Sequence, residues 1–150
     1  MKKYYYPGWE YKHVDLCDDA AYVNSNGRLV MPTKEQYEEL MNCCNVERKM
    51  HYMNIGGLHG RLFTSKSNGN QLFFPEADVK TNIEHQEFNL HQNCFNICYY
   101  WTSSLYSCDG GNTCLPEALM ISDGSGSSYM FVSSVCHATG LPVRGIKNFH

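Results

Sequence analysis

The clearest pattern of apolar and polar positions in the sequence lies between residues 33 and 44. Apolar side chains recur there every three or four residues, which is the spacing of one face of an α-helix. These apolar positions are Tyr37, Leu40, Met41 and Cys44. Thr33 and Gln36, at the start of the run, have the spacing of a capping box, in which each side chain accepts from the other residue's backbone N–H. The pattern predicts one main amphipathic helix over about 33–44.

Short alternating or aromatic-rich runs predict β-strands in the rest of the chain. Two pairs of runs are joined by Gly-containing segments and so predict β-hairpins. These hairpins are 61–65 with 71–74, across Asn68-Gly69, and 117–122 with 128–134, across 123–127. The other predicted strands are 11–16, 28–31, 99–104 and 141–146. In the strand 99–104 we expect Trp101 to face the core.

The segments between these elements are polar and irregular. We expect residues 1–10 to form an aromatic N-terminal segment, and residues 76–98 and 105–115 to form long loops. One helix, several short and mostly antiparallel strands and two long loops indicate an α+β fold. A length of 150 residues is typical of a single domain, so residues 1–150 are predicted to form one.

Charge and hydropathy exclude two classes of partner. A net charge of −3 gives no basic surface for nucleic acid, so we expect no nucleic-acid binding. No run of apolar residues is long enough for a transmembrane helix, so we expect no membrane insertion. The first residues contain two lysines but lack the apolar run of a signal peptide.

Four separated segments, in this order, resemble one protein family. They are Trp9 with His13-Val14-Asp15-Leu16, the run from Leu29 to Leu40 (LVMPTKEQYEEL), the hairpin from Gly60 through Ser67-Asn68-Gly69-Asn70 to Pro75, and Tyr100-Trp101-Thr102-Ser103-Ser104 with Pro142-Val143-Arg144. The order and spacing of these motifs are similar to those of the Fibrobacter succinogenes major paralogous domain. The resemblance extends over residues 9–147. Glu76 and Gly145 depart from the family pattern, which has a small residue and a proline at these positions.

The resemblance implies a C-type-lectin-like fold, similar to that of formylglycine-generating enzymes and of diversified phage tail proteins. In such folds the late part of the chain forms the exposed ligand-binding face. Formylglycine-generating enzymes use a C-terminal cysteine pair, for which Cys114 and Cys136 are the candidates here. No set of residues around them fills the roles of nucleophile, base and orienting group. We therefore predict that the protein is not an enzyme.

The eight cysteines are expected to be free thiols, because a domain of this length does not need disulfides to fold. One bridge within 94–114 is the alternative. Zinc is disfavoured because His91, Cys94, Cys98, Cys108 and Cys114 lack the close Cys-x-x-Cys pairs of a structural site. Calcium is disfavoured because Asp109, Asn112 and Asp123 are typical turn residues. No metal and no cofactor is predicted.

The region from 88 to 137 is rich in Tyr, Trp, Ser, Gly and Asn, the residues of adaptable recognition surfaces. The predicted ligand-binding residues are Tyr99, Tyr106, Asp109, Asn112, Tyr129 and His137. Adenine-directed mutagenesis of Asn codons produces the same residue types, so this region is also a candidate hypervariable segment.

These observations predict a non-enzymatic adhesin or receptor-binding module, displayed on a phage particle or a bacterial surface. Its expected partner is a host-surface glycan or protein. The alternative is a structural or assembly subunit of a virion or surface appendage, which forms a homo-oligomer or a larger assembly. A metal- or cysteine-dependent enzyme is the third hypothesis.

Overall fold

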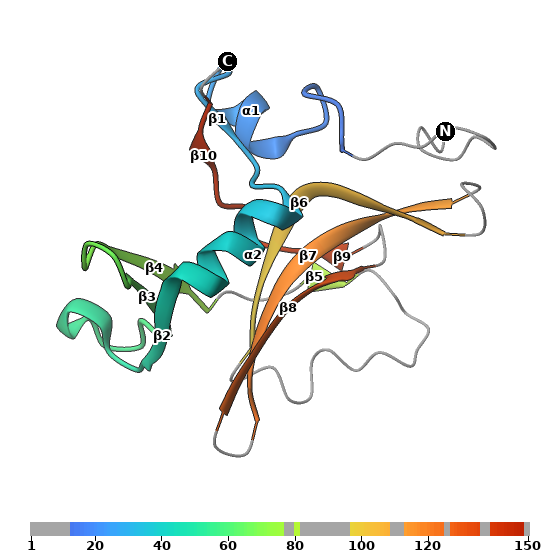
Figure 1. The fold of residues 1–150 in the computed structure, drawn as a ribbon. Coiled ribbons are helices and arrows are strands. Elements are labelled where there is room, and N and C mark those ends of the chain that lie inside the picture. Colours follow the sequence, from blue (N-terminus) through green and yellow to red (C-terminus); the bar gives the residue numbers. More distant parts are fainter. Residues whose placement is uncertain are drawn as a thin grey trace.

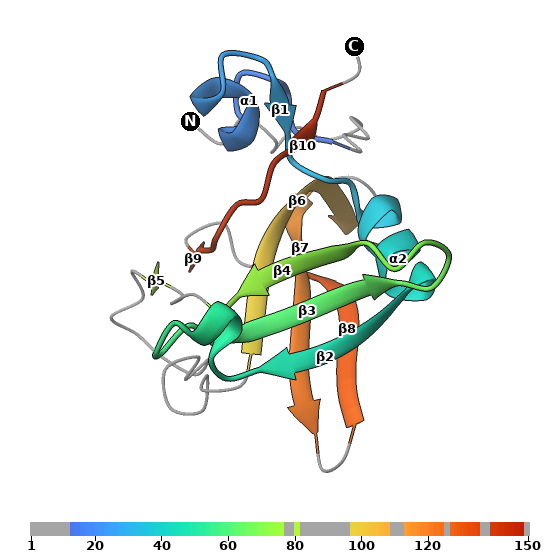
Figure 2. The same ribbon diagram turned by 90° about the vertical axis from the view of Figure 1, so that its left-hand side faces the viewer.

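The computed structural model describes residues 13–76, 80–81, 97–108, 113–124, 127–135 and 139–148. Two three-stranded antiparallel sheets face each other, and helix α2 (Lys34–Cys43) runs beside them (Figures 1 and 2). One sheet contains β2 (Cys44–Lys49), β3 (Gly60–Ser65) and β4 (Gln71–Pro75), and the other contains β6 (Ile97–Cys108), β7 (Thr113–Gly124) and β8 (Ser127–Ser134). The sheet-rich α+β class predicted from the sequence is confirmed.

The main helix begins as the sequence predicts. Thr33 Oγ1 accepts from the backbone N–H of Gln36 at 3.2 Å, and the Gln36 side chain accepts from the Thr33 N–H at 2.8 Å. This reciprocal pair satisfies two of the amides that a helix start leaves without partners. Tyr37 is 2% exposed and belongs to the core, with the other three apolar residues of the predicted stripe packed against it. The predicted amphipathic helix is confirmed.

The core lies between α2 and the two sheets. Its fully or nearly buried members come from the helix and from both sheets, and are Tyr37, Phe63, Phe74, Cys98, Tyr100, Leu119 and Ile121. Met130 and Val132 of β8 pack against this cluster. Because side chains alternate between the faces of a strand, only one face of the β6–β7–β8 sheet contributes to the core.

Strand β6 is interrupted by a bulge that ties it to its neighbour. The pairing with β7 shifts between Trp101 and Leu105, so residues 102–104 lie opposite Glu117. The Thr102 hydroxyl donates to the Glu117 carbonyl at 2.9 Å and accepts from the Ser104 N–H at 3.1 Å. Bulges leave backbone groups without ladder partners, and here side chains supply those partners.

The same bulge contacts segments that are distant in the sequence. The Ser103 N–H donates to the Pro32 carbonyl and the Val14 N–H donates to the Ser103 carbonyl, both at 2.8 Å. The Ser104 hydroxyl accepts from the Lys34 N–H at 2.9 Å. The N-terminal segment and the start of α2 are therefore fixed on β6.

Two short strand pairs complete the described fold. Strand β1 (Leu29–Val30) pairs with β10 (Ile146–Lys147), so an early and a late segment of the chain lie side by side. Strand β5 (Lys80–Thr81) pairs with β9 (Thr139–Gly140). Helix α1 (Ala20–Asn24) lies beside the first pair (Figure 1).

Both predicted hairpins are present. Strands β3 and β4 are joined across Gly69, whose φ of +73° is the backbone conformation that the turn requires. Strands β7 and β8 extend beyond their predicted ends, to Gly124 and back from Ser127. The hairpin prediction is confirmed at both places.

Four local predictions are wrong. The strand predicted for 11–16 is reduced, within the described residues, to one bridge at His13, because 16–18 turn toward α1. The segment between the predicted strands 11–16 and 28–31, expected to be irregular, contains α1, since the buried Asp19 caps this helix by accepting from the N–H groups of Ala21 and Tyr22. Strand β2 was not predicted, because Val46 is its single strongly apolar residue. Residues 141–145 form no regular strand, and only Ile146 of the predicted terminal strand pairs with β1.

The prediction of a loop at 105–115 is also wrong for the part of this segment that the structure describes. Tyr106 pairs with Leu115 and Cys108 pairs with Thr113, so both ends of this segment extend β6 and β7. The aromatic segment 1–10 and most of the predicted loop 76–98 lie outside the described residues.

Replacing Thr33 by Ala removes one half of the capping box. We expect the free energy of unfolding to fall by about 1 kcal/mol, which is typical for loss of a helix cap. Thr33→Ser keeps the hydroxyl and serves as the matched control, with a change of less than about half that size. Urea denaturation of the three proteins measures both values, and equal stability of the Ala and Ser variants contradicts the role of the cap.

Candidate recognition surface

The face of the β6–β7–β8 sheet that points away from the core carries a group of large side chains. Cys98, Tyr100, Leu119, Ile121, Met130 and Val132 all belong to the core or pack against it. Their neighbours along each strand must then point to the opposite side. We call this group the outer aromatic face, and its members are Tyr99, Trp101, Met120 and Phe131.

Three of these residues form one row across the sheet. Tyr99 pairs with Met120, and Met120 pairs with Phe131. Side chains directly opposite each other on antiparallel strands have Cβ atoms about 5 Å apart, so the row is continuous. The exposed fraction is 7% at Tyr99 and 42% at Phe131. The face is therefore closed to solvent at β6 and open at β8.

Tyr99 was expected at the surface, and this prediction is wrong. Its side chain lies near the middle of β6, and Ala118 in the adjacent row of the same face is 1% exposed. This half of the outer aromatic face is thus buried. Trp101 was expected in the core, but alternation places it on the outer face, where it is partly buried. Tyr100, between these two residues, lies in the core at 4% exposure.

Tyr106 lies at the surface as expected, with 51% of its area exposed. It pairs with Leu115 near the end of β6, whereas the backbone of Tyr129 pairs with Ser122 near the other end of β7. At 3.3 Å per residue these two positions on β7 are roughly 23 Å apart. The structure therefore does not bring Tyr106 and Tyr129 into one site.

The backbone of Tyr129 pairs with Ser122, two residues along β7 from Met120, the partner of Tyr99. The side chain of Tyr129 lies outside the described part of the chain, as do Asp109, Asn112 and His137. Their roles in ligand binding stay predictions. The residue that sequence reasoning missed is Phe131, whose signal was its place in the alternating run Tyr129-Met130-Phe131-Val132.

A buried ion cluster stabilises the other sheet. Arg61 is fully buried, and its Nη1 lies 2.6 Å from Glu76 Oε1. The same carboxylate oxygen lies 3.1 Å from Nε of Arg48. The Glu76 carboxylate thus forms ion pairs with both arginines, which lowers the electrostatic penalty of burying Arg61. Glu76 departs from the pattern of the family that the sequence resembles, and its pairing with the two arginines stabilises the fold.

Two buried tyrosines have strongly perturbed hydroxyl groups. Burial raises the pKa of the Tyr37 phenol far above its usual range, and the nearby Tyr100 raises it further, while Arg144 opposes both effects. Burial is also the main cause of the raised pKa of Tyr100. The Tyr100 hydroxyl donates to the Pro75 carbonyl at 2.6 Å. The Tyr37 hydroxyl has no partner among the described residues.

Two of the described cysteines, Cys44 and Cys98, have the setting of poor nucleophiles. Cys98 is fully buried, and its thiol lies 4.0 Å from the Phe74 carbonyl. Burial raises the pKa of Cys44, and the adjacent Cys43 adds to this effect. Reactive cysteines need the opposite, a lowered pKa in an electropositive and accessible setting.

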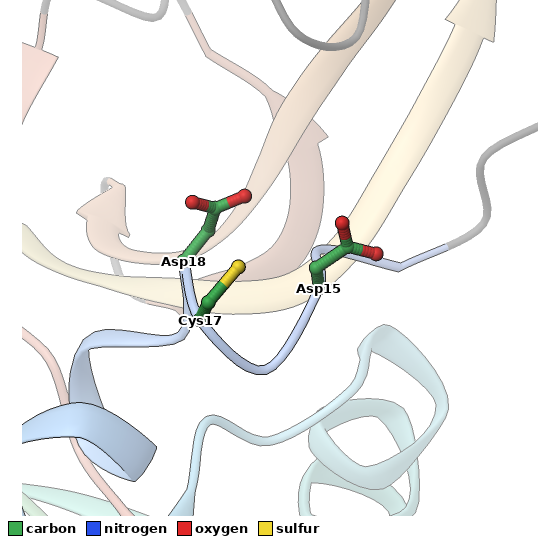
Figure 3. A group of neighbouring side chains, drawn as sticks. All are labelled: Asp15, Cys17 and Asp18. Carbon is green, nitrogen blue, oxygen red and sulfur yellow. The ribbon is translucent and has the colours of Figure 1, made fainter.

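One group of potential metal ligands stands in the turn before α1. Asp15, Cys17 and Asp18 have ligand atoms within 4.8 Å of one another, and all three residues are exposed (Figure 3). The turn is held by the Asp18 N–H, which donates to the Asp15 carbonyl at 2.8 Å. Exposed carboxylates of this kind are common without an ion, and the geometry assigns no metal to them.

Comparisons with protein-family models, with curated proteins and with solved structures gave no match. A search of the described residues for a helix of sufficient length and hydrophobicity to cross a bilayer found none.

The two perturbed tyrosines make stability dependent on alkaline pH. An unfolded tyrosine ionises near pH 10, whereas the folded pKa values of Tyr37 and Tyr100 lie higher. Stability is therefore fully present below about pH 10 and falls as the pH rises further, by roughly 1.4 kcal/mol per pH unit for each tyrosine. Tyr37→Phe should make this decline shallower.

At neutral pH the two Phe variants should differ. Tyr100→Phe loses the hydrogen bond to Pro75 and should cost about 1 kcal/mol, whereas Tyr37→Phe removes a hydroxyl without a described partner and should be neutral or stabilising. Denaturant titrations at neutral and alkaline pH measure both effects. A larger loss for Tyr37→Phe than for Tyr100→Phe at neutral pH contradicts this assignment.

Proposed function

We propose that this protein is a non-enzymatic recognition module that binds a glycan or a protein through the open, β8 side of its outer aromatic face. The observation that carries the proposal is the exposure of Phe131, at 42%, in a row with Met120 and Tyr99. Large rings supply contact area with little loss of conformational freedom, and they are enriched at binding hot spots.

The rigidity of the support favours this assignment. Met130 and Val132, on either side of Phe131, pack against the core, and Met120 beside it belongs to the central strand. A ring that projects from a packed sheet is held in place before a partner arrives. Such preorganisation lowers the entropy that binding must overcome.

The polar surroundings fit a sugar or a polar protein surface. The exposed Ser133, two residues after Phe131 along β8, lies on the same face, and its hydroxyl group can donate and accept hydrogen bonds. An aromatic platform beside a small hydroxyl residue is typical of adaptable recognition surfaces.

The non-enzymatic assignment is supported by the settings of Cys44 and Cys98. Burial raises the pKa of Cys44 and encloses Cys98, so neither has the setting of a nucleophile. Metal-dependent catalysis remains the weaker hypothesis, since the exposed group at Asp15, Cys17 and Asp18 combines hard and soft ligands on one short turn.

The resemblance to lectin-like folds also favours recognition. In this chain the pairing of β1 with β10 brings an early and a late segment together, and the fold is rich in short antiparallel strands. We propose a C-type-lectin-like fold on these grounds, together with display on a virion or a cell surface. The second candidate function, a structural or assembly subunit, is favoured by the uncharged edge strand β8.

Glycan arrays and binding to intact bacterial cells test recognition. Phe131→Ala should weaken binding on the order of tenfold or more, as expected for an aromatic hot spot, without changing the fold. The matched control is Tyr106→Ala, which truncates an equally exposed ring far from Phe131 and should bind as the parent does.

Thermal denaturation of both variants separates a loss of binding from a loss of folding. Normal binding by a folded Phe131→Ala protein contradicts the proposed site. Loss of binding in Tyr106→Ala alone would place the ligand at the other end of the sheet.

A further inference from the structure

Strand β8 has an edge that the described part of the fold leaves open. It pairs with β7 along its whole length, and within the part of the chain that the structure describes no strand pairs with its other side. Figures 1 and 2 show β8 at the margin of the sheet. The open edge of a strand displays backbone N–H and C=O groups that can pair with another strand.

The register identifies which residues of β8 carry these groups. The Val135 N–H donates to the Pro116 carbonyl at 2.8 Å, in line with the β7–β8 ladder. In an antiparallel ladder the N–H and C=O of alternate residues point to the same neighbour. The backbone N–H and C=O groups of the odd-numbered residues of β8 therefore point to β7. The groups on the open edge belong to Ser128, Met130, Val132 and Ser134.

The opposite edge of the same sheet is covered. The Trp101 N–H of β6 donates to the Pro142 carbonyl at 3.0 Å, and the Ser103 N–H donates to the Pro32 carbonyl. Both partners are prolines outside the regular strands, and a proline has no N–H to offer to a further strand. The β6 edge is therefore closed to strand pairing here.

The edges of the second sheet are protected in two other ways. Strand β2 carries Glu47, Arg48 and Lys49, and charged side chains on an edge strand discourage pairing. On β4, the Phe73 carbonyl accepts from Arg144 Nη1 at 2.7 Å, and the Pro75 carbonyl accepts from the Tyr100 hydroxyl. Side chains thus occupy the outward carbonyls of β4.

Within the residues that the structure describes, none of these protections is present on β8. Residues 127–135, Ser-Ser-Tyr-Met-Phe-Val-Ser-Ser-Val, include no charge and no proline. The aromatic and β-branched residues in the middle of the strand favour extended structure. A strand with these properties at an open edge is suited to pairing with another strand, and its neutrality allows it to pair with itself.

We propose that β8 is an assembly surface, and that its partner is β8 of a second copy of this chain. The two strands run antiparallel about a two-fold axis perpendicular to the sheet, and the two sheets become one six-stranded sheet. This arrangement is isologous, as in most homodimers. It goes beyond the recognition function, because the backbone groups of the β8 edge make the pairing.

The symmetry restricts the register of this pair. A two-fold axis perpendicular to the sheet keeps the core faces of both copies on one side, so core-facing residues must pair with core-facing residues. An axis at Phe131 pairs Met130 with Val132, whose N–H and C=O groups both point outward. The two outer aromatic faces are then continuous, and the two Phe131 rings lie next to each other at the centre.

Sedimentation velocity of the full chain over a wide range of concentration tests the proposal. The parent should change from monomer to dimer as its concentration rises. Phe131→Lys and Phe131→Glu should each weaken the dimer by on the order of tenfold or more, because like charges then meet across the axis. An equimolar mixture of these two variants should restore dimerisation, because opposite charges meet instead.

Tyr106→Lys is the matched control, since it replaces another exposed aromatic residue of the same sheet by the same charge, away from the β8 edge. It should dimerise as the parent does. Ser134→Pro tests the backbone directly, because it removes an N–H of the open edge at an exposed side chain, and it should weaken the dimer. Circular dichroism of each variant confirms that it is folded.

A parent that stays monomeric at every concentration overturns the proposal. So does equal weakening by Phe131→Lys and Tyr106→Lys, or a mixture of the two charged variants that does not dimerise. Glycan or cell binding that survives in a monomeric Ser134→Pro variant, which keeps Phe131, would leave the recognition function standing, so the two proposals fail separately.

Discussion

The buried bulge at Thr102–Ser104 connects parts of the molecule that lie far apart in the sequence. A bulge inside a fold leaves peptide groups away from water, and each needs a hydrogen-bond partner. Here the Ser103 N–H donates to Pro32, the Ser103 carbonyl accepts from Val14, and the Thr102 hydroxyl accepts from the Ser104 N–H. The Thr102 hydroxyl also donates to the Glu117 carbonyl, and the Ser104 hydroxyl accepts from the Lys34 N–H at the start of α2. These contacts hold the start of the helix and the N-terminal segment against the central sheet. That arrangement places one face of the sheet in the core and directs the other face outward.

The sequence predicts the elements whose signals are local. The capping box of α2 and the turn at Gly69 depend on side chains within a few residues of one another, and both were found as predicted. Strand β2 was missed because its edge position leaves it largely polar, and the cap of α1 depends on Asp19, which also accepts from the distant Met31 N–H. Such tertiary contacts override local propensity and leave no periodic trace.

The candidate site was only partly predictable for the same reason. Composition indicated an aromatic recognition surface in the later half of the chain, and that half does form the sheet with an outward face. Which rings are exposed depends on the strand register and on what packs against the sheet. Tyr99 is buried, whereas Phe131 is exposed. The region predicted as the loop 105–115 instead continues β6 and β7, so Tyr106 lies far from Tyr129. A composition signal cannot distinguish the two faces or the two ends of one sheet.

The central claim is that the β6–β7–β8 sheet separates a sealed face from one whose β8 side is open to a partner. Hydroxyl-radical footprinting with mass spectrometry, on the dilute chain, measures this directly. The account predicts modification of Phe131 and Tyr106 and protection of Phe63 and Phe74, which are 0% and 1% exposed. Protection of Phe131 to the level of Phe74 in the dilute, monomeric chain would contradict it.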